Sequence, residues 1–332
     1  MKRGLFLIIV TIVIGVTTKA LAQTKDVIQL IELAERGSST AQLVLANKYE
    51  KGIGIEKDLV KAESWYKRAI SNGSNISNVY LAALKEKCNN KAEAYKYFMQ
   101  YYLDVTNAIK GKGKVDKFDA NSFTLCQYKI GEYKLYGFDG VSKDVQGAIP
   151  YLKDAALNSY GESAYFNLCT AYLELGDSLD AFNIAEQCTE KYKSTRAYVN
   201  LAGYYMNGIG CDKDLNKAYD LILPLAEKKD ATVLLTLGNL HSKSEFKLFN
   251  YSLAFKRYSE MLVLCETSML SDSRNAKYYT ALKATALRKL SKCYRFGRGV
   301  NQDTQKAEEL LNEAAQYGNE DAKSLLDLIM DN

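Results

Sequence analysis

An apolar residue and an alanine recur at one fixed distance along this chain, and that distance constrains the fold more than any other feature. Leucine is followed by alanine seventeen residues later in four places, and isoleucine is followed by alanine eighteen residues later in a fifth. A fixed period indicates stacked units, none of which buries its apolar face alone. The pairs are Leu45 and Ala62, Ile130 and Ala148, Leu201 and Ala218, Leu237 and Ala254, and Leu290 and Ala307.

Each unit contains two segments with apolar residues at helical spacing. A Gly-x-Gly pair separates them in the units that begin at Ala41, Ala197 and Ala286. The first glycine suits the left-handed residue that ends a helix, and the second allows a tight return of the chain. A polar residue four positions before the alanine suits the N-cap of a second helix. These predicted caps are Asp58, Asp144, Asp214, Asn250 and Asp303.

Two shorter units bring the expected number of helix pairs to seven. Leu81 precedes Ala92 by eleven residues, and Leu168 precedes Ala181 by thirteen. With only 2 prolines in 332 residues, long helices are permitted throughout the chain. Lone helices are expected at about 26–37 and 320–330, and longer insertions at about 104–121 and 266–280.

The residues of these units resemble the Sel-like (Sel1) repeat, a relative of the tetratricopeptide repeat. The units at Ala41, Ala197 and Ala286 match its pattern closely, the unit at Ile130 partly, and the unit at Leu168 resembles a plain tetratricopeptide repeat. The resemblance covers about 38–330. It implies an all-α fold, a right-handed α-solenoid of about seven helix-turn-helix repeats with an extended concave surface. It also implies a scaffold or adaptor rather than an enzyme.

The first 22 residues have the pattern of a secretory signal peptide. Lys2 and Arg3 precede an apolar run, and Ala20 and Ala22 stand where a signal peptidase reads small residues. Residues 1–22 are therefore predicted to be removed after Ala22, leaving a repeat domain over 23–332 that is periplasmic or secreted. An uncleaved anchor is the alternative, but the 15 uncharged residues 4–18 are shorter than the roughly 20 that span a bilayer. No stable membrane span is expected after cleavage.

The charge of the mature chain argues against nucleic acid as a partner. Without Lys2, Arg3 and Lys19, 41 basic residues face 39 acidic ones, a net charge of +2. The basic run over 110–117 could contact nucleic acid or anionic lipid, but a solvated, flexible insertion is the favoured interpretation. No cofactor or metal is expected, because the chain has one histidine, His241, and no C-x-x-C pair. His241 is expected at a surface or capping position.

Seven cysteines follow the signal segment, so in an oxidising compartment at least one stays free or pairs between chains. Cys169 and Cys188 are the disulfide candidate, because they take the places of Ala46 and Ala69, small facing residues of a sister repeat. Buried thiols are the alternative. Cysteine-rich members of the resembled family contain such links in a more regular pattern.

One motif raises an enzymatic alternative. Ser64 and Lys67 have the S-x-x-K spacing of penicillin-recognising serine enzymes, and some cysteine-rich relatives of the repeat are associated with β-lactam binding. The companion motifs S-D-N and K-T-G do not occur. Ser64 is therefore interpreted as an ordinary residue of a second helix.

The first helices of tetratricopeptide-like stacks line a groove, and a mixed aromatic and polar groove suits an extended peptide or a partner helix. The alternative is that these positions are ordinary exposed helix residues. The groove residues expected from the repeat register are Asn47, Lys51, Tyr128, Glu132, Tyr136, Phe166, Thr170, Met206, Asn207, Arg288, Lys292 and Arg295.

Together these features predict an exported, non-enzymatic and monomeric repeat protein that binds a protein or peptide partner on its concave face. Three alternatives remain open. They are a cysteine-rich-type β-lactam-binding hydrolase, a secreted effector acting on host proteins, and an envelope protein that binds glycans.

Overall fold

A computed structural model describes residues 26–114, 118–158, 160–271 and 273–330. The predicted signal peptide over 1–22 lies outside the described residues, as does part of the basic run at 115–117. The described chain is helical and contains no strand beyond one isolated bridge between Phe138 and Val141. It divides into two compact units, one up to Leu175 and one from Gly176.

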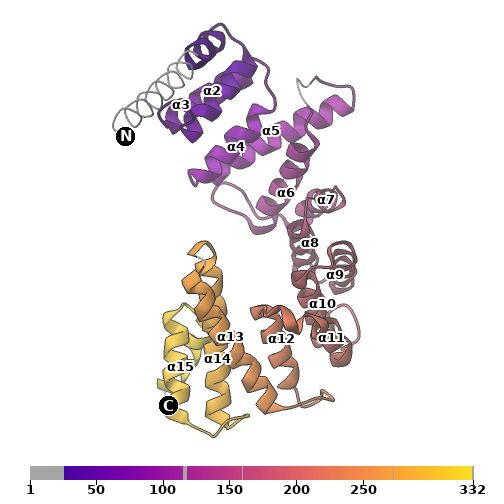
Figure 1. Ribbon diagram of the computed structural model, residues 1–332. Helices are drawn as coiled ribbons and strands as arrows, with labels where there is room; N and C mark the ends of the chain where they lie inside the picture. The colour runs from indigo at the N-terminus through magenta and orange to yellow at the C-terminus, as the bar shows by residue number, and fades with distance from the viewer. Residues whose placement is uncertain (1–25, 115–117, 159, 272, 331–332) are drawn as a thin grey trace, which may run out of the picture. The chain divides into compact units, whose positions relative to one another are not determined.

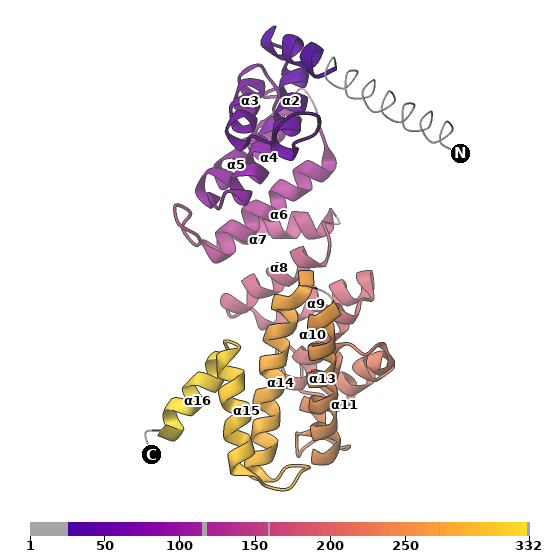
Figure 2. The same ribbon diagram turned by 60° about the vertical axis from the view of Figure 1, so that its left-hand side comes forward.

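The first unit stacks antiparallel helices in chain order (Figures 1 and 2). A helix over residues 26–35 comes first. The helices that follow are α2 (Ser39–Lys51), α3 (Leu59–Ser71), α4 (Ser77–Lys87), α5 (Lys91–Ile109), α6 (Ala120–Tyr136), α7 (Val145–Leu157) and α8 (Glu162–Glu174).

The second unit continues the same alternation, and α13, α14 and α15 lie side by side in it (Figure 2). Its helices are α9 (Ser178–Tyr192), α10 (Thr195–Asn207), α11 (Leu215–Ile222), η1 (Leu223–Lys228), α12 (Ala231–His241), α13 (Tyr251–Ser271), η2 (Ser273–Asn275), α14 (Ala276–Phe296), α15 (Thr304–Gln316) and α16 (Glu320–Met330).

The prediction of an all-α solenoid with seven helix pairs is confirmed. The pairs begin at α2, α4, α6, α8, α10, α12 and α14, and α8 and α9 stand on either side of the boundary between the units. The lone first helix and the closing α16 are confirmed too. The insertion expected at 266–280 mostly lengthens α13 and α14, so it adds helical turns rather than a long loop.

The predicted helix caps form as the residue types require. All five N-cap side chains accept a hydrogen bond from the backbone N–H three residues later, at 2.8 to 3.0 Å. The first glycine of each Gly-x-Gly pair ends its helix in the left-handed region, with φ of 72° at Gly52 and 62° at Gly297. The helix ends are therefore set by local sequence.

The second glycine of each pair has a role that the sequence does not reveal. A Cβ at Gly299 would lie 2.2 Å from the carbonyl oxygen of Tyr251, the first residue of α13. A Cβ at Gly210 would lie 2.0 Å from the carbonyl oxygen of Ser178, the first residue of α9. In both places the loop packs against the second helix of the preceding pair, so this glycine serves the contact between repeats as well as the turn.

The histidine prediction is wrong. His241 is only 4% exposed and packs near the rings of Tyr219 and Phe246. Its Nδ1 lies 2.9 Å from the carbonyl oxygen of Leu248. The imidazole therefore holds the loop between α12 and α13 against the core, because that loop lacks the glycine pair used elsewhere.

Candidate functional site

In the first unit, polar side chains link the first helix of each pair to the first helix of the next pair. Lys87 on α4 pairs with Glu50 on α2. Glu86, also on α4, contacts α6, and α6 in turn contacts Asn167 on α8. The first helices therefore form one connected row, and its centre is α6.

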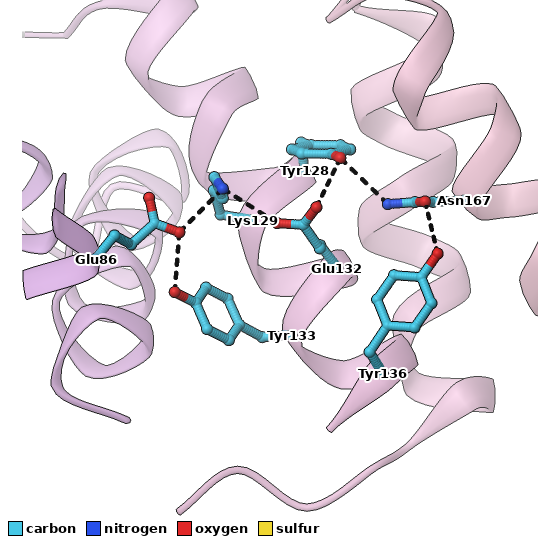
Figure 3. A network of polar contacts seen from close by, with 7 residues as sticks. All are labelled: Glu86, Tyr128, Lys129, Glu132, Tyr133, Tyr136 and Asn167. Carbon is cyan, nitrogen blue, oxygen red and sulfur yellow. Dashed lines mark hydrogen bonds and ion pairs between the residues drawn. The ribbon is translucent and has the colours of Figure 1, made fainter. Parts of the chain in front are cut away.

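We call the centre of this row the tyrosine network (Figure 3). Its members are Glu86 on α4, Tyr128, Lys129, Glu132, Tyr133 and Tyr136 on α6, and Asn167 on α8.

Glu132 holds one half of the network together. It accepts hydrogen bonds from the hydroxyl of Tyr128 at 2.8 Å and from the ammonium of Lys129 at 3.1 Å. Lys129 also lies 2.9 Å from Glu86, which accepts a hydrogen bond from the hydroxyl of Tyr133 at 2.9 Å. The two carboxylates thus share one ammonium between α4 and α6.

Asn167 joins the other half of the network to α8. Its carbonyl oxygen accepts from the hydroxyl of Tyr136 at 3.0 Å, and its amide donates to the hydroxyl of Tyr128 at 3.3 Å. The spacing of α6 explains this division. Tyr128, Glu132 and Tyr136 recur every four residues and share one face, while Lys129 and Tyr133 lie one position further round, toward α4.

The surroundings of Tyr128, Tyr133 and Lys129 favour the ordinary ionisation state of each of these three groups. Burial and the hydrogen bond to Glu132 raise the pKa of Tyr128, and burial and the nearby charge of Glu86 raise the pKa of Tyr133. Burial alone would lower the pKa of Lys129, but the bonds to Glu86 and Glu132 outweigh it and raise that pKa. None of these three groups is brought toward neutral pH, where a general acid or base would need to titrate.

The network presents an aromatic edge to solvent. Tyr136 is 46% exposed, and the Thr170 hydroxyl lies beside its own. Tyr128 is buried, because its ring stacks on Tyr160 with centroids 4.1 Å apart. Phe166 is half-buried on α8. Of the predicted groove residues, five therefore meet at α6 and α8, and Tyr136 is the one most open to a partner.

The remaining predicted residues of the first unit lie on α2. Lys51 is exposed, whereas Asn47 is half-buried beside the hydroxyl of the buried Tyr66. In the second unit, Met206 on α10 is only 6% exposed, so it belongs to the packed interior and offers little surface. Its neighbour Asn207 is exposed but donates to the carbonyl of Gly203 on its own helix.

Arg288, Lys292 and Arg295 come together on α14, as their spacing predicts. They line one pocket with Phe296, and Arg288 lies 3.4 Å from Asp321 on α16. Lys289, one residue further round the helix, is half-buried and faces the ring of Tyr258 at 6.0 Å. Burial, and then the charges of Arg288 and Lys292, lower the pKa of Lys289 to about 8.

Replacing Lys289 with methionine is expected to raise the free energy of unfolding by about 1 kcal/mol at pH 7, because it removes a half-buried charge that has no carboxylate partner among the described residues. The folded-state pKa of about 8 lies below the ordinary 10.5. The unfolded chain therefore binds more protons between these values, and the wild type gains stability as pH rises through them. Urea unfolding at pH 7 and pH 9.5 should show the advantage of the variant shrinking. An equal advantage at both pH values would contradict this account.

In the S-x-x-K motif, the lysine is paired with a carboxylate. Ser64 is exposed on α3, and the ammonium of Lys67 lies 2.7 Å from Glu63. The hydrogen bond to Glu63 raises the pKa of Lys67, so this lysine stays protonated at neutral pH. A protonated lysine cannot accept the proton of a serine hydroxyl. Ser64 is thus placed as an ordinary exposed residue of a second helix.

The predicted disulfide falls on the two sides of the boundary between the units. Cys169 is buried on α8 and Cys188 is buried on α9. Their link stays a prediction. Among the described residues, no three histidine, cysteine or acidic side chains gather where they could hold a metal ion.

Comparison with known proteins identifies the repeats. The sequence model of the Sel1 repeat family matches residues 39–74, 124–160, 195–230 and 284–319. The chain carries four Sel1 repeats. They correspond to α2–α3, α6–α7, α10–η1 and α14–α15, the units at which the sequence resemblance is closest. The helix pairs between them have the same form but lie outside the matched segments.

Two solved structures share this fold. A Sel1 repeat protein from Oxalobacter formigenes is 16% identical, with a TM-score of 0.54 over 91% of this chain and 90% of that one. A protective antigen of uropathogenic Escherichia coli strains, which displays an SLR fold, is 19% identical, with a TM-score of 0.54 over 91% of this chain and 67% of that one. No curated protein matches the chain. None of the described helices is both long and apolar enough to cross a membrane.

Sequence reasoning missed Glu86, Lys129, Tyr133 and Asn167. The helical spacing of α6 alone could have placed Lys129 and Tyr133 toward a neighbouring helix. Glu86 and Asn167 lie on α4 and α8, whose pairs have a shorter link between their two helices than the others and lie outside the matched Sel1 segments. Their register against α6 is set by packing, so no spacing in the sequence predicts which residues meet there.

Proposed function

We propose that this protein is an exported, non-enzymatic scaffold that binds a protein or peptide partner on the first helices of its first unit. Sel1 and tetratricopeptide-like repeats typically mediate protein–protein interactions, and their first helices line the concave face of the stack. The observation that carries the proposal is the tyrosine network. It fixes an exposed aromatic edge at Tyr136 against α8, the helix that also carries the exposed Leu173, while its buried polar groups hold one another in place.

A surface of this kind binds without first having to order its side chains. Fixing a rotamer-rich side chain at an interface costs about 0.5–1.5 kcal/mol, and the hydrogen bond from Tyr136 to Asn167 has already fixed that ring. Tyrosine is also enriched among the residues that dominate binding energy. The partner expected here is an extended peptide or a helix that offers apolar side chains to Tyr136 and Leu173.

The test is affinity capture from the envelope and secreted fractions of the source cells with the tagged protein. A Tyr136→Ser/Leu173→Ser variant removes the proposed contact. A Val60→Ser/Leu157→Ser variant removes two exposed apolar side chains from the second helices α3 and α7 and serves as the matched control. We expect a partner that the wild type and the control retain and the Tyr136 variant loses. A partner retained equally by all three would place the contact on another face and refute this one.

Export is tested on the same material. The proposal expects the mature chain to begin at Gln23, and N-terminal sequencing of the purified protein measures this. A chain that retains residues 1–22 in the cytoplasm would refute export. Partners from a host cell instead of the envelope would favour a secreted effector, and retention on purified peptidoglycan would favour glycan binding.

A further inference from the structure

The second half of α14 carries three cations on one side of the helix. Arg288, Lys292 and Arg295 follow one another at intervals of four and three residues, so they share a face. Cations in the last turn of a helix complement its dipole, which accounts for Arg295. Arg288 and Lys292 lie one to two turns earlier, beyond the reach of that effect. The stability of the helix therefore does not explain the row.

The three cations line a pocket of about 600 Å³ between α14, α15 and α16. Its other walls include Phe296, Leu311 and Leu325. Phe296 is 56% exposed and Leu325 is 41% exposed, so the apolar walls are open to solvent. The volume lies within the range of roughly 300–1,000 Å³ in which proteins hold ligands. The pocket thus combines positive charge with apolar surface.

Among the described residues, the carboxylates near these cations are Asp321 and Glu308, and Glu308 lines a smaller neighbouring pocket together with Arg295. Asp321 lies 3.4 Å from the guanidinium of Arg288, and within the described residues Lys292 and Arg295 form no salt bridge. The Nε of Arg288 is buried and donates to no described acceptor.

The neighbouring Lys289 lies in the positive electrostatic potential of these cations. The charges of Arg288 and Lys292 add to burial in lowering its pKa. The cations thus repel one another across the helix, and a negatively charged ligand would relieve that repulsion.

We propose that the pocket lined by Arg288, Lys292, Arg295, Phe296, Leu311 and Leu325 binds an acidic segment of a protein partner in which carboxylates flank a bulky apolar side chain. The guanidinium groups match carboxylates in geometry as well as in charge. An apolar side chain fits between Phe296 and Leu325. A phosphate polymer would use the cations but leave the leucine walls without a complementary group. The inference rests on the proposed function and names the partner chemistry at a second surface.

The test is fluorescence anisotropy of the purified protein with the labelled synthetic peptide SEDLEEFLDEGS. Two control peptides test the two kinds of contact separately. In one, every carboxylate is changed to its amide, which tests the contact with the cations. In the other, leucine and phenylalanine are changed to serine, which tests the contact with the apolar walls. We expect both to bind at least tenfold more weakly than the first peptide. Binding of that peptide should also weaken with rising salt, because exposed charges are screened.

Substitutions in the protein test whether the peptide binds at this pocket. Lys292→Glu/Arg295→Glu is expected to weaken the first peptide at least tenfold. Lys256→Glu/Lys306→Glu makes the same change in net charge at exposed positions of α13 and α15 outside the pocket, and should change binding less than twofold. Circular dichroism checks that each variant is folded. Phe296→Ser keeps the charges and should weaken binding at least threefold through the apolar wall.

Several outcomes would overturn the inference. Equal losses in both charge variants would mean attraction by net charge alone, and equal binding of the amide peptide would mean that carboxylates are not recognised. Tighter binding of phosphatidylglycerol vesicles or of a single-stranded oligonucleotide than of the peptide would assign the pocket to phosphate ligands. Failure here, with capture still lost in Tyr136→Ser/Leu173→Ser, would remove this pocket and leave the proposed function intact. If the peptide binds at the pocket but no partner is captured in a way that depends on Tyr136 and Leu173, the proposed function is refuted and the pocket remains a binding site.

Discussion

Replacing Gly299 with alanine is expected to lower the free energy of unfolding by about 3 kcal/mol, because two separate costs combine at one position. The φ of +78° is a left-handed conformation that disfavours a side chain. The new Cβ would also lie 2.2 Å from the carbonyl oxygen of Tyr251 and 2.5 Å from its carbonyl carbon. Those atoms belong to the start of α13, so the loop can relieve the clash only by moving away from the preceding pair.

Gly318 provides the matched control for this prediction. Its φ is +83°, and a Cβ there would meet nothing within 4 Å. Gly318→Ala should therefore show the conformational cost alone, about 1 kcal/mol. Urea unfolding followed by circular dichroism measures both variants. Equal losses would mean that the contact between repeats contributes nothing at Gly299.

Replacing Gly238 with alanine is expected to cost about 2–3 kcal/mol, although alanine is the better helix former. Gly238 lies inside α12, and a Cβ there would come within 2.5 Å of the ring of Tyr258 on α13. Tyr258 is 2% exposed, and its hydroxyl donates to Asn239 at 3.0 Å. The ring is thus held from both ends and has no room to retreat.

A double-mutant cycle tests this reason directly. Tyr258→Ala alone should cost about 3–5 kcal/mol through the cavity that it leaves, whereas Tyr258→Phe should cost only about 1 kcal/mol for the hydrogen bond. In the Tyr258→Ala background, Gly238→Ala should cost nothing or add up to about 1 kcal/mol of stability, because the ring is gone and alanine favours the helix. The expected coupling is about 2–3 kcal/mol. Additive effects of the two changes would show that the ring is not what excludes a side chain from position 238.

Local sequence was enough to predict the helices and most of their ends. The N-cap at Asp303 and the left-handed end of α14 at Gly297 depend on residues within a few positions of each other, so a short pattern determines them. The spacing of an apolar residue and an alanine predicted five pairs, because it reflects two helices and one turn of nearly fixed length, and shorter spacings predicted the other two. The face of α14 that carries Arg288, Lys292 and Arg295 followed from helical spacing in the same way.

His241 and Met206 show where that reasoning stops. His241 was expected at a surface or capping position and Met206 in the groove, yet both are buried. The loop after α12 lacks the glycine pair and folds back onto the imidazole instead. Whether a side chain in a first helix faces solvent thus depends on which loop or neighbouring helix covers it.

The sequence by itself therefore determined the repeat, its helix ends and the residue types on each helix face, since these depend on contacts within a few turns of chain. Only the tertiary structure decided which faces meet. It placed Glu86 and Asn167 on the two sides of α6, set Gly299 against the start of α13, and closed α16 over the cations of α14 to make a pocket. These contacts join residues of different repeats, and close packing fixes their register, which no periodic pattern along one helix records.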